Sequence, residues 1–135
     1  MLLDRLEAIT VCVNYADFLA ETLPLNVPLF DRILVVTEAT DMATREVCRR
    51  NNVQCLLSED GKLCGEFCKG RLVERGLQHL SSQAWRVHLD ADIALPANTR
   101  HMLQAAQLDQ SKIYGCDRVM CRDWDEWKRV LASGY

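Results

Sequence analysis

Short apolar runs alternate with amphipathic stretches along most of the chain, and this alternation constrains the fold more than any other feature. The runs are rich in β-branched residues and end in polar ones, which is typical of strands buried on both faces. The intervening stretches carry apolar residues at helical spacing. Strands that alternate with helices assemble into a parallel sheet. The sequence therefore predicts an α/β fold with an open, mostly parallel sheet and helices on both faces.

The boundaries of these elements follow from the same pattern. The expected strands cover 8–14, 31–38, 53–57, 85–90 and a last short segment at 111–115. The expected helices lie between 17 and 23 and over 42–50, 67–80, 99–108 and 123–131. Asp17 is the expected cap of the first helix and Pro24 its expected end, because proline interrupts helical hydrogen bonding. Thr40 or Asp41 is expected to cap the second helix, and the strand at 31–38 should lie beside that at 8–14.

Length and composition predict a single domain over residues 1–135. The chain has 135 residues, of which 49% are hydrophobic and 26% charged, so one core can stabilise it without disulfides or metals. We expect a core at about 8–100 and a shortened C-terminal part at 101–135. The net charge is -3 and no run of Lys and Arg exceeds two residues, which disfavours nucleic acid and anionic membranes as partners.

The apolar stretches are far shorter than the roughly 20 residues that span a bilayer, so no membrane-spanning segment is expected. The start of the sequence, MLLDRLEAIT, has neither the basic region nor the long apolar region of a secretory signal. These features predict a cytoplasmic protein.

The seven cysteines predict reduced thiols. An odd number is unusual for a secreted disulfide framework, and we interpret most of these residues as small buried hydrophobic side chains in a reducing compartment. No disulfide is then essential. The alternative is a structural zinc site made by four of them, although neither pair has the common C-x-x-C spacing. Those four are Cys64, Cys68, Cys116 and Cys121.

Polar residues follow the expected strands, at the edge of a parallel sheet where ligands bind. Asp90 and Asp92 stand one residue apart after the fourth strand. Hard carboxylate oxygens of this kind suit Mg²⁺ or Mn²⁺, with phosphate oxygens and water as further ligands. A solvated turn whose carboxylates cap a neighbouring element is the alternative interpretation. Polar residues also follow the other strands, and they are Asn14, Tyr15, Asp17, Thr37, Glu38, Asp41, Glu59 and Asp60.

The segment WRVHLDADIALP at 85–96, as the fourth strand of the series, resembles the D-x-D segment of nucleotide-sugar glycosyltransferases of the GT-A fold, particularly the inverting family 2 type. The runs at 9–14 and 31–37 are similar to the first two strands of that family, and the resemblance covers about 8–100. It implies a GT-A, Rossmann-like fold. It also implies transfer of a sugar from a nucleoside-diphosphate sugar to an acceptor hydroxyl with the help of Mg²⁺ or Mn²⁺.

The resemblance also implies roles for individual residues. Asp90 would lie near the ribose and the metal, and Asp92 would be the metal ligand proper. Lys69 or Arg71 would contact the phosphates, although a solvated helix face explains both equally well. The base and ribose would be held by Val13, Asn14, Tyr15, Thr37 and Glu38.

The acceptor half of the family has little counterpart here, since 43 residues follow Asp92. Asp125 and Glu126, with Asp123, are the downstream acids that could act as the catalytic base, and Trp124 and Trp127 could stack on a sugar. The alternative is a helix whose first turn is acidic and whose tryptophans are buried in the core. A second copy or a partner chain could complete the acceptor site.

Two further interpretations stay open beside the enzyme. One is a degenerate, non-catalytic module for nucleotide-sugar binding or assembly, because the chain is short. The other is a phosphatase of the haloacid-dehalogenase type, which is disfavoured because its D-x-D normally follows the first strand and because Ala94 stands where its motif has Thr or Val.

Overall fold

A computed structural model describes residues 3–58, 62–63 and 66–134. These residues divide into two compact units, one within 3–95 and one within 96–134. The first contains the sheet and its helices. Among the described residues, none of the helices is long and apolar enough to cross a membrane.

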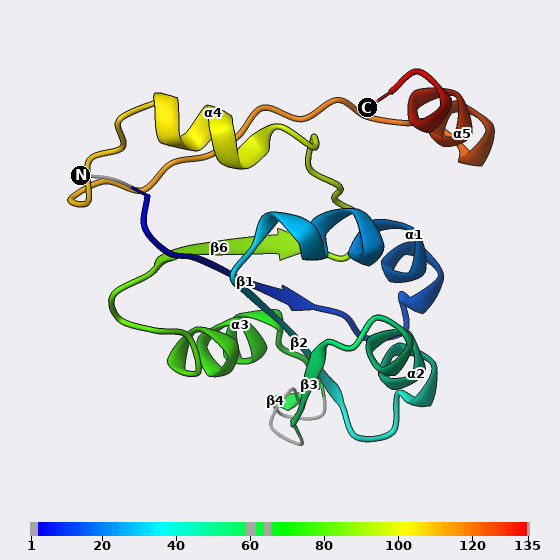
Figure 1. Cartoon of the computed structure of the whole chain (residues 1–135). Coiled ribbons are helices and arrows are strands. Elements are labelled where there is room, and N and C mark those ends of the chain that lie inside the picture. The colour runs from blue at the N-terminus through cyan, green and yellow to red at the C-terminus, as the bar shows by residue number, and fades with distance from the viewer. Residues whose placement is uncertain (1–2, 59–61, 64–65, 135) are drawn as a thin grey trace. The chain divides into compact units, whose positions relative to one another are not determined.

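The 3–95 unit is built on a four-stranded sheet in which every neighbouring pair is parallel (Figure 1). The strand order is β3-β2-β1-β6, so that β2 lies beside β1, as predicted. The strands are β1 (Leu6–Val11), β2 (Arg32–Glu38), β3 (Gln54–Ser58) and β6 (Trp85–Asp90). The α/β class, the parallel sheet and the end of the fourth strand at Asp90 are all confirmed.

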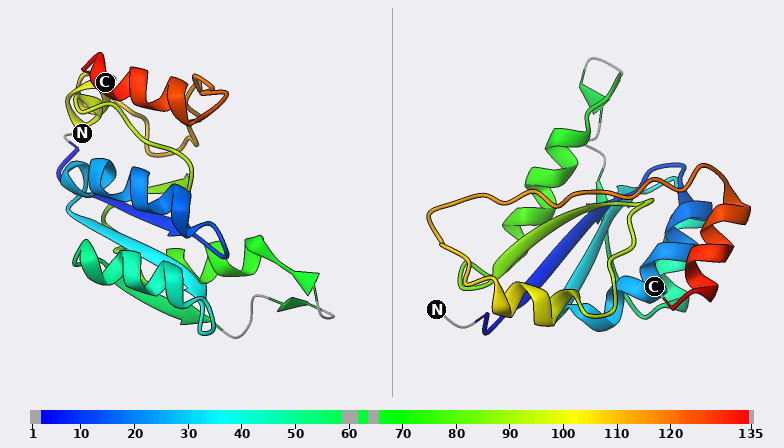
Figure 2. Two further views of the ribbon diagram at one scale, coloured as in Figure 1. Left: turned by 90° about the vertical axis from the view of Figure 1, so that its right-hand side faces the viewer. Right: turned by 90° about the horizontal axis from the view of Figure 1, so that it is seen from above.

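Helices flank this sheet on both faces (Figure 2). On one face α1 and α2 pack against each other, and α3 covers the opposite face of β1 and β2. The helices are α1 (Ala16–Asn26), α2 (Met42–Arg50) and α3 (Lys69–Gln78). A 3-10 turn η1 (Val27–Leu29) follows α1, and a two-stranded antiparallel ladder pairs β4 (Lys62–Leu63) with β5 (Glu66–Phe67). Glu59 and Asp60, named as polar strand-end residues, lie outside the described residues.

The core beneath α3 depends on a close approach of helix and sheet. Ile9 and Leu34 are fully buried and pack with Val73 and Leu77 of α3, and Leu72 of α3 packs with Val36 in a second cluster. Gly76 faces the same strands, and a Cβ there would lie 2.9 Å from Val36 Cγ2 and 3.1 Å from Ile9 Cδ1. The missing side chain lets the helix lie directly on the sheet, which explains why a helix-weakening residue stands inside α3.

Three expected boundaries in the 3–95 unit are wrong for identifiable reasons. β1 ends at Val11 instead of Asn14, because Asn14 adopts a left-handed backbone (φ 60°) that turns the chain toward α1. Pro24 lies inside α1 and does not end it. Proline has no N–H to donate to the carbonyl four residues earlier, which is that of Ala20. Pro24 and Ala20 are both exposed, so this carbonyl is open to water instead. Asp17 lies in the first turn of α1, whose cap position belongs to Tyr15.

The 96–134 unit contains two short helices, α4 (Thr99–Ala105) and α5 (Trp124–Ala132). The expected strand at 111–115 is wrong, since no strand pairs with these residues in the described part of the chain and Ile113 is fully exposed. Asp125 and Glu126 lie in the first turn of α5, as the helix interpretation predicts, and Asp123 caps the helix, with its Oδ1 accepting from the Glu126 N–H at 2.8 Å. Burial of the two tryptophans is not observed: Trp124 is exposed and Trp127 is half-buried.

Candidate functional site

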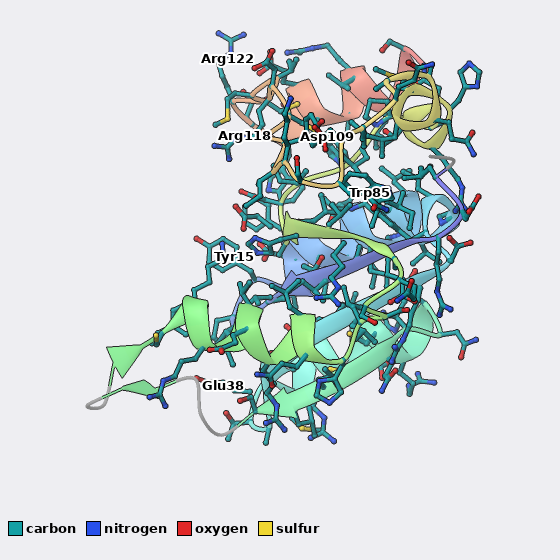
Figure 3. All side chains as sticks on the ribbon, turned by 90° about the vertical axis from the view of Figure 1, so that its left-hand side faces the viewer. Tyr15, Glu38, Trp85, Asp109, Arg118 and Arg122 are labelled. Carbon is teal, nitrogen blue, oxygen red and sulfur yellow. The ribbon has the colours of Figure 1, made fainter. Side chains whose placement is uncertain are left out.

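The carboxyl edge of the sheet brings together residues that are far apart in the sequence. In the strand register Val11 lies opposite both Val36 and Asp90, so the ends of β1, β2 and β6 are adjacent. Figure 3 shows Tyr15 and Glu38 on this same side of the 3–95 unit, whereas Trp85 begins β6 at the other end. This edge is therefore the place where the predicted binding residues of the unit meet.

Asp41 organises the polar contacts at the end of β2. Its Oδ2 accepts from the Asn14 N–H at 2.8 Å, from Thr44 Oγ1 at 2.7 Å and from Thr37 Oγ1 at 3.3 Å. Its Oδ1 accepts from the Thr44 N–H at 3.0 Å, which caps α2 as the sequence predicted. Burial opposes ionisation, but the hydrogen bonds from Asn14 and Thr44 outweigh it, so the pKa of Asp41 lies below its ordinary value.

The five residues predicted to hold the base and the ribose differ in their exposure to solvent. Asn14 and Tyr15 are exposed, and the Tyr15 ring stacks on Phe18 with centroids 5.3 Å apart. Val13 is half-buried against the core cluster beneath α3. The Thr37 side chain is fully buried against Asp41, so it positions that carboxylate instead of meeting a ligand. Glu38 is half-buried at the last position of β2.

A second polar group lies at the end of β6. The ammonium of Lys69, the first residue of α3, donates a hydrogen bond to Asp90 Oδ1. His88 Nε2 lies 3.7 Å from the same oxygen. Burial lowers the pKa of His88 below its ordinary value and Lys69 adds to this, while Asp90 opposes it. The sequence named Lys69 and Asp90, and the fold brings them together. Arg71 lies exposed in the first turn of α3.

His88 was not predicted as part of this group. The signal was present, because residues two apart on a strand point to the same face and His88 precedes Asp90 by two. Its alternation with Val87 and Leu89 instead suggested a half-buried strand position without a role.

The loop that carries Asp92 is fixed by α1. The Ile93 N–H donates to the Asp90 carbonyl at 3.1 Å and closes a turn in which Asp92 is exposed. The hydroxyl of Thr22 donates to the Ala91 carbonyl at 2.6 Å. The Asn26 side chain donates to the Ile93 carbonyl at 2.8 Å and accepts from the Leu95 N–H at 2.9 Å.

Thr22 and Asn26 were not singled out from the sequence. Both are buried polar residues on one face of α1, four positions apart. Polar side chains at this spacing on the apolar face of a helix are the signal that could have found them, since buried polar groups need partners.

Asp90 and Asp92 are the two residues at the end of β6 that could hold a divalent cation. Among the described residues no group of three or more His, Cys, Asp or Glu side chains could hold a metal ion by itself. Mg²⁺ is commonly held by one or two carboxylates, with phosphates and water completing its shell. Asp92 is exposed and Asp90 is half-buried beside it in the sequence, which fits this mode.

Asp125 and Glu126 belong to the 96–134 unit. Glu126 Oε2 accepts from the Arg122 N–H at 2.6 Å and from Arg122 Nε at 3.2 Å. These hydrogen bonds lower the pKa of Glu126 below its ordinary value. Asp125 is exposed, with its Oδ1 3.9 Å from Lys128 Nζ. Their role as a catalytic base stays a prediction.

The cysteines of the zinc alternative lie partly outside the described residues, because Cys64 is not described. Its counterpart Cys68 immediately precedes α3, and Cys116 and Cys121 belong to the other unit. The six cysteines in the described part of the chain are free thiols.

Comparison with known protein families gives no match to this chain. No curated protein matches it either. The resemblance to GT-A glycosyltransferases therefore stands on the residues of the sequence, and the site stands on its own geometry.

Proposed function

We propose that the carboxyl edge of the 3–95 unit binds a nucleoside-diphosphate sugar and supports metal-assisted transfer of the sugar to an acceptor hydroxyl. One observation carries the proposal. Asp90 ends β6 beside the end of β1 and pairs with the cation of Lys69, and Asp92 lies on the following loop, which α1 holds in place. Parallel α/β sheets bind their ligands at this edge.

The exchangeable contact in this site is the pair of Lys69 and Asp90. Both side chains are partly exposed, at 44% and 38%, so their attraction is weakened by water and is easily replaced. A diphosphate that enters the site offers Lys69 a stronger partner than one carboxylate. Lys69 then donates to phosphate oxygens, and Asp90 is released to face the ribose or the cation.

Other residues orient the donor. Tyr15 presents an aromatic ring that is 53% exposed and is supported from behind by Phe18, which suits stacking on a nucleobase. Asp92 supplies the exposed carboxylate that holds the cation. Mg²⁺ or Mn²⁺, when bound, neutralises the negative charge that develops on the departing diphosphate.

The second candidate is a binding module without catalysis, and the state of Glu126 favours it. A general base works best when its pKa is raised toward the working pH. Glu126 is instead held in its ionised form by Arg122, with a lowered pKa. If Asp125 does not act as the base either, the chain binds the donor and needs a partner chain to supply the base.

The decisive experiment is calorimetric titration of the protein with a panel of nucleoside diphosphates in the presence of Mn²⁺. The Asp92→Asn variant keeps the side-chain shape and removes the charge, and we expect it to lose about 2 kcal/mol, more than roughly tenfold in affinity. Its matched control is Asp4→Asn, an exposed acid that precedes β1 at the opposite edge, and its affinity should be unchanged.

Unchanged affinity in both Asp92→Asn and Asp90→Asn would contradict the proposed site. Release of nucleoside diphosphate from a nucleotide sugar then separates the two candidates. Release that depends on Asp92 supports the enzyme, whereas binding without release supports the module.

A further inference from the structure

Two cysteines line one groove where α2 is followed by β3. Cys48 is in the last turns of α2 and Cys55 is the second residue of β3. A short turn joins them, with the Val53 N–H donating to the Cys48 carbonyl at 2.9 Å. This turn folds β3 back against α2, and both cysteines line the groove between the two elements.

The two thiols differ in access and in acidity. Cys48 is 1% exposed, whereas Cys55 is half-buried. The hydrogen bond from Cys48 lowers the pKa of Cys55; burial opposes this shift, Arg45 supports it and Asp41 opposes it. The same bond raises the pKa of Cys48, and burial, Cys12 and Asp41 raise it further. Cys55 is therefore the nucleophile of the pair, and Cys48 keeps its proton.

A groove gives access to this pair. It has a volume of about 620 Å³, within the usual range for small-molecule sites, and runs between α2 and β3. β3 is an outer strand of the described sheet (Figure 1). The groove, which β3 lines together with α2, therefore lies at the side of the sheet. Its lining includes two guanidinium groups, Arg45 and Arg49, against one carboxylate, Glu46. Arg49 is paired with Glu46 by two hydrogen bonds of 2.7 Å, so the guanidinium of Arg45 is the cation of this lining that favours an anionic occupant.

We propose that Cys55 and Cys48 form a dithiol that reduces a small anionic disulfide bound in this groove. The chemical class is a disulfide whose two halves carry carboxylates. This activity is separate from the proposed donor site, since it uses the side of the sheet and none of the residues at the carboxyl edge named above.

The exchange is balanced in two steps. The Cys55 thiolate attacks one sulfur of the small disulfide, which forms a mixed disulfide and releases one thiolate. The Cys48 thiol then loses its proton and attacks the Cys55 sulfur, which forms the Cys48–Cys55 disulfide and releases the second small thiol. Two protein thiols are oxidised by two electrons, and one small disulfide is reduced to two thiols.

Oxidised glutathione is a suitable probe because both of its halves carry carboxylates. The reduced protein is incubated with it, quenched by alkylation and digested with trypsin, which cleaves after Arg49 and Arg50 and so separates Cys48 from Cys55. We expect a linked pair of peptides, 46–49 with 51–62, to appear before any glutathione adduct on Cys116. Cys116 is the matched control because its thiol is exposed and lies in the other unit.

Two variants test the order of events. Cys48→Ser should stop the reaction at a stable glutathione adduct on Cys55, and Arg45→Gln should slow formation of the linked peptides severalfold. Failure to detect the linked peptides in the unmodified chain, or modification of Cys116 at the same rate as Cys55, would overturn the proposal. Cys48 is buried, so the Cys48→Ser variant can fail to fold. In that case the results for the unmodified chain alone decide whether the proposal stands.

Discussion

Asp41 follows β2 and Asp90 ends β6, the two strands on either side of β1, so both lie at the same edge of the sheet, yet they are held in different ways. Asp41 is buried and accepts hydrogen bonds from two backbone N–H groups and two hydroxyls of its own unit. Asp90 is partly exposed and accepts from the ammonium of a long surface side chain, Lys69. The first arrangement joins β1, β2 and α2. The second can be exchanged for a ligand at little cost to the fold.

The largest expected effect on the free energy of unfolding comes from removing the buried carboxylate of Asp41. Asp41→Ala removes the cap of α2 and leaves the part-buried Asn14 N–H and the buried Thr44 hydroxyl without their acceptor, so we expect a loss of about 3 kcal/mol in the free energy of unfolding. Urea denaturation measures this. Asp123→Ala, which removes the exposed cap of α5, is the matched control and should cost about 1 kcal/mol. Equal losses in the two variants would show that the contacts of Asp41 beyond its cap contribute nothing.

A smaller effect is expected from pH. The ordinary pKa is 3.8, and the pKa of Asp41 in the folded protein lies below it. The ionised group therefore stabilises the fold at pH values above 3.8, and this contribution is lost as the pH falls through the lower, folded value. Urea denaturation at a series of acidic pH values should show a steeper loss in the unmodified chain than in Asp41→Asn. Parallel curves would contradict the lowered pKa.

The smallest effect on folding is expected at the exposed pair. Lys69→Met removes a partly exposed ion pair and should change the free energy of unfolding by less than about 0.5 kcal/mol. The same variant should weaken binding of nucleoside diphosphates, measured by calorimetry. Arg86→Met, an exposed cation at the second position of β6, should change neither property. A large loss of stability in Lys69→Met would contradict the prediction that the pair of Lys69 and Asp90, unlike the contacts of Asp41, contributes little to the fold.

The sequence predicts those parts of the fold that depend on local pattern. Met42–Arg50 and Trp85–Asp90 were predicted with the bounds that the structure shows, because periodicity and capping are properties of neighbouring residues. The misplaced ends at Asn14 and Pro24 depend on tertiary surroundings. Asn14 turns early because Asp41 bonds its N–H, and Pro24 is tolerated because it faces solvent.

The same division applies to the candidate site. The D-x-D pair and Lys69 were visible as residue types, but the contact between Lys69 and Asp90 depends on the tertiary placement of the first residue of α3 within reach of the end of β6. The cap by Asp41 was predictable because Thr44 is three residues away. Its bond to Asn14 spans 27 positions, and nothing in the local sequence indicates it. Thr37 was expected to meet a ligand because its burial depends on α2, which packs over the end of β2.

Asn26 gives the loop after β6 a property that its own sequence does not provide. A side-chain amide has the same donor and acceptor as a peptide group, and here it bonds the Ile93 carbonyl and the Leu95 N–H as a neighbouring strand would. The loop therefore has a surrogate backbone partner supplied by α1. Side chains in the loop can change while its path stays the same, so the chemistry at position 92 is uncoupled from the architecture that presents it.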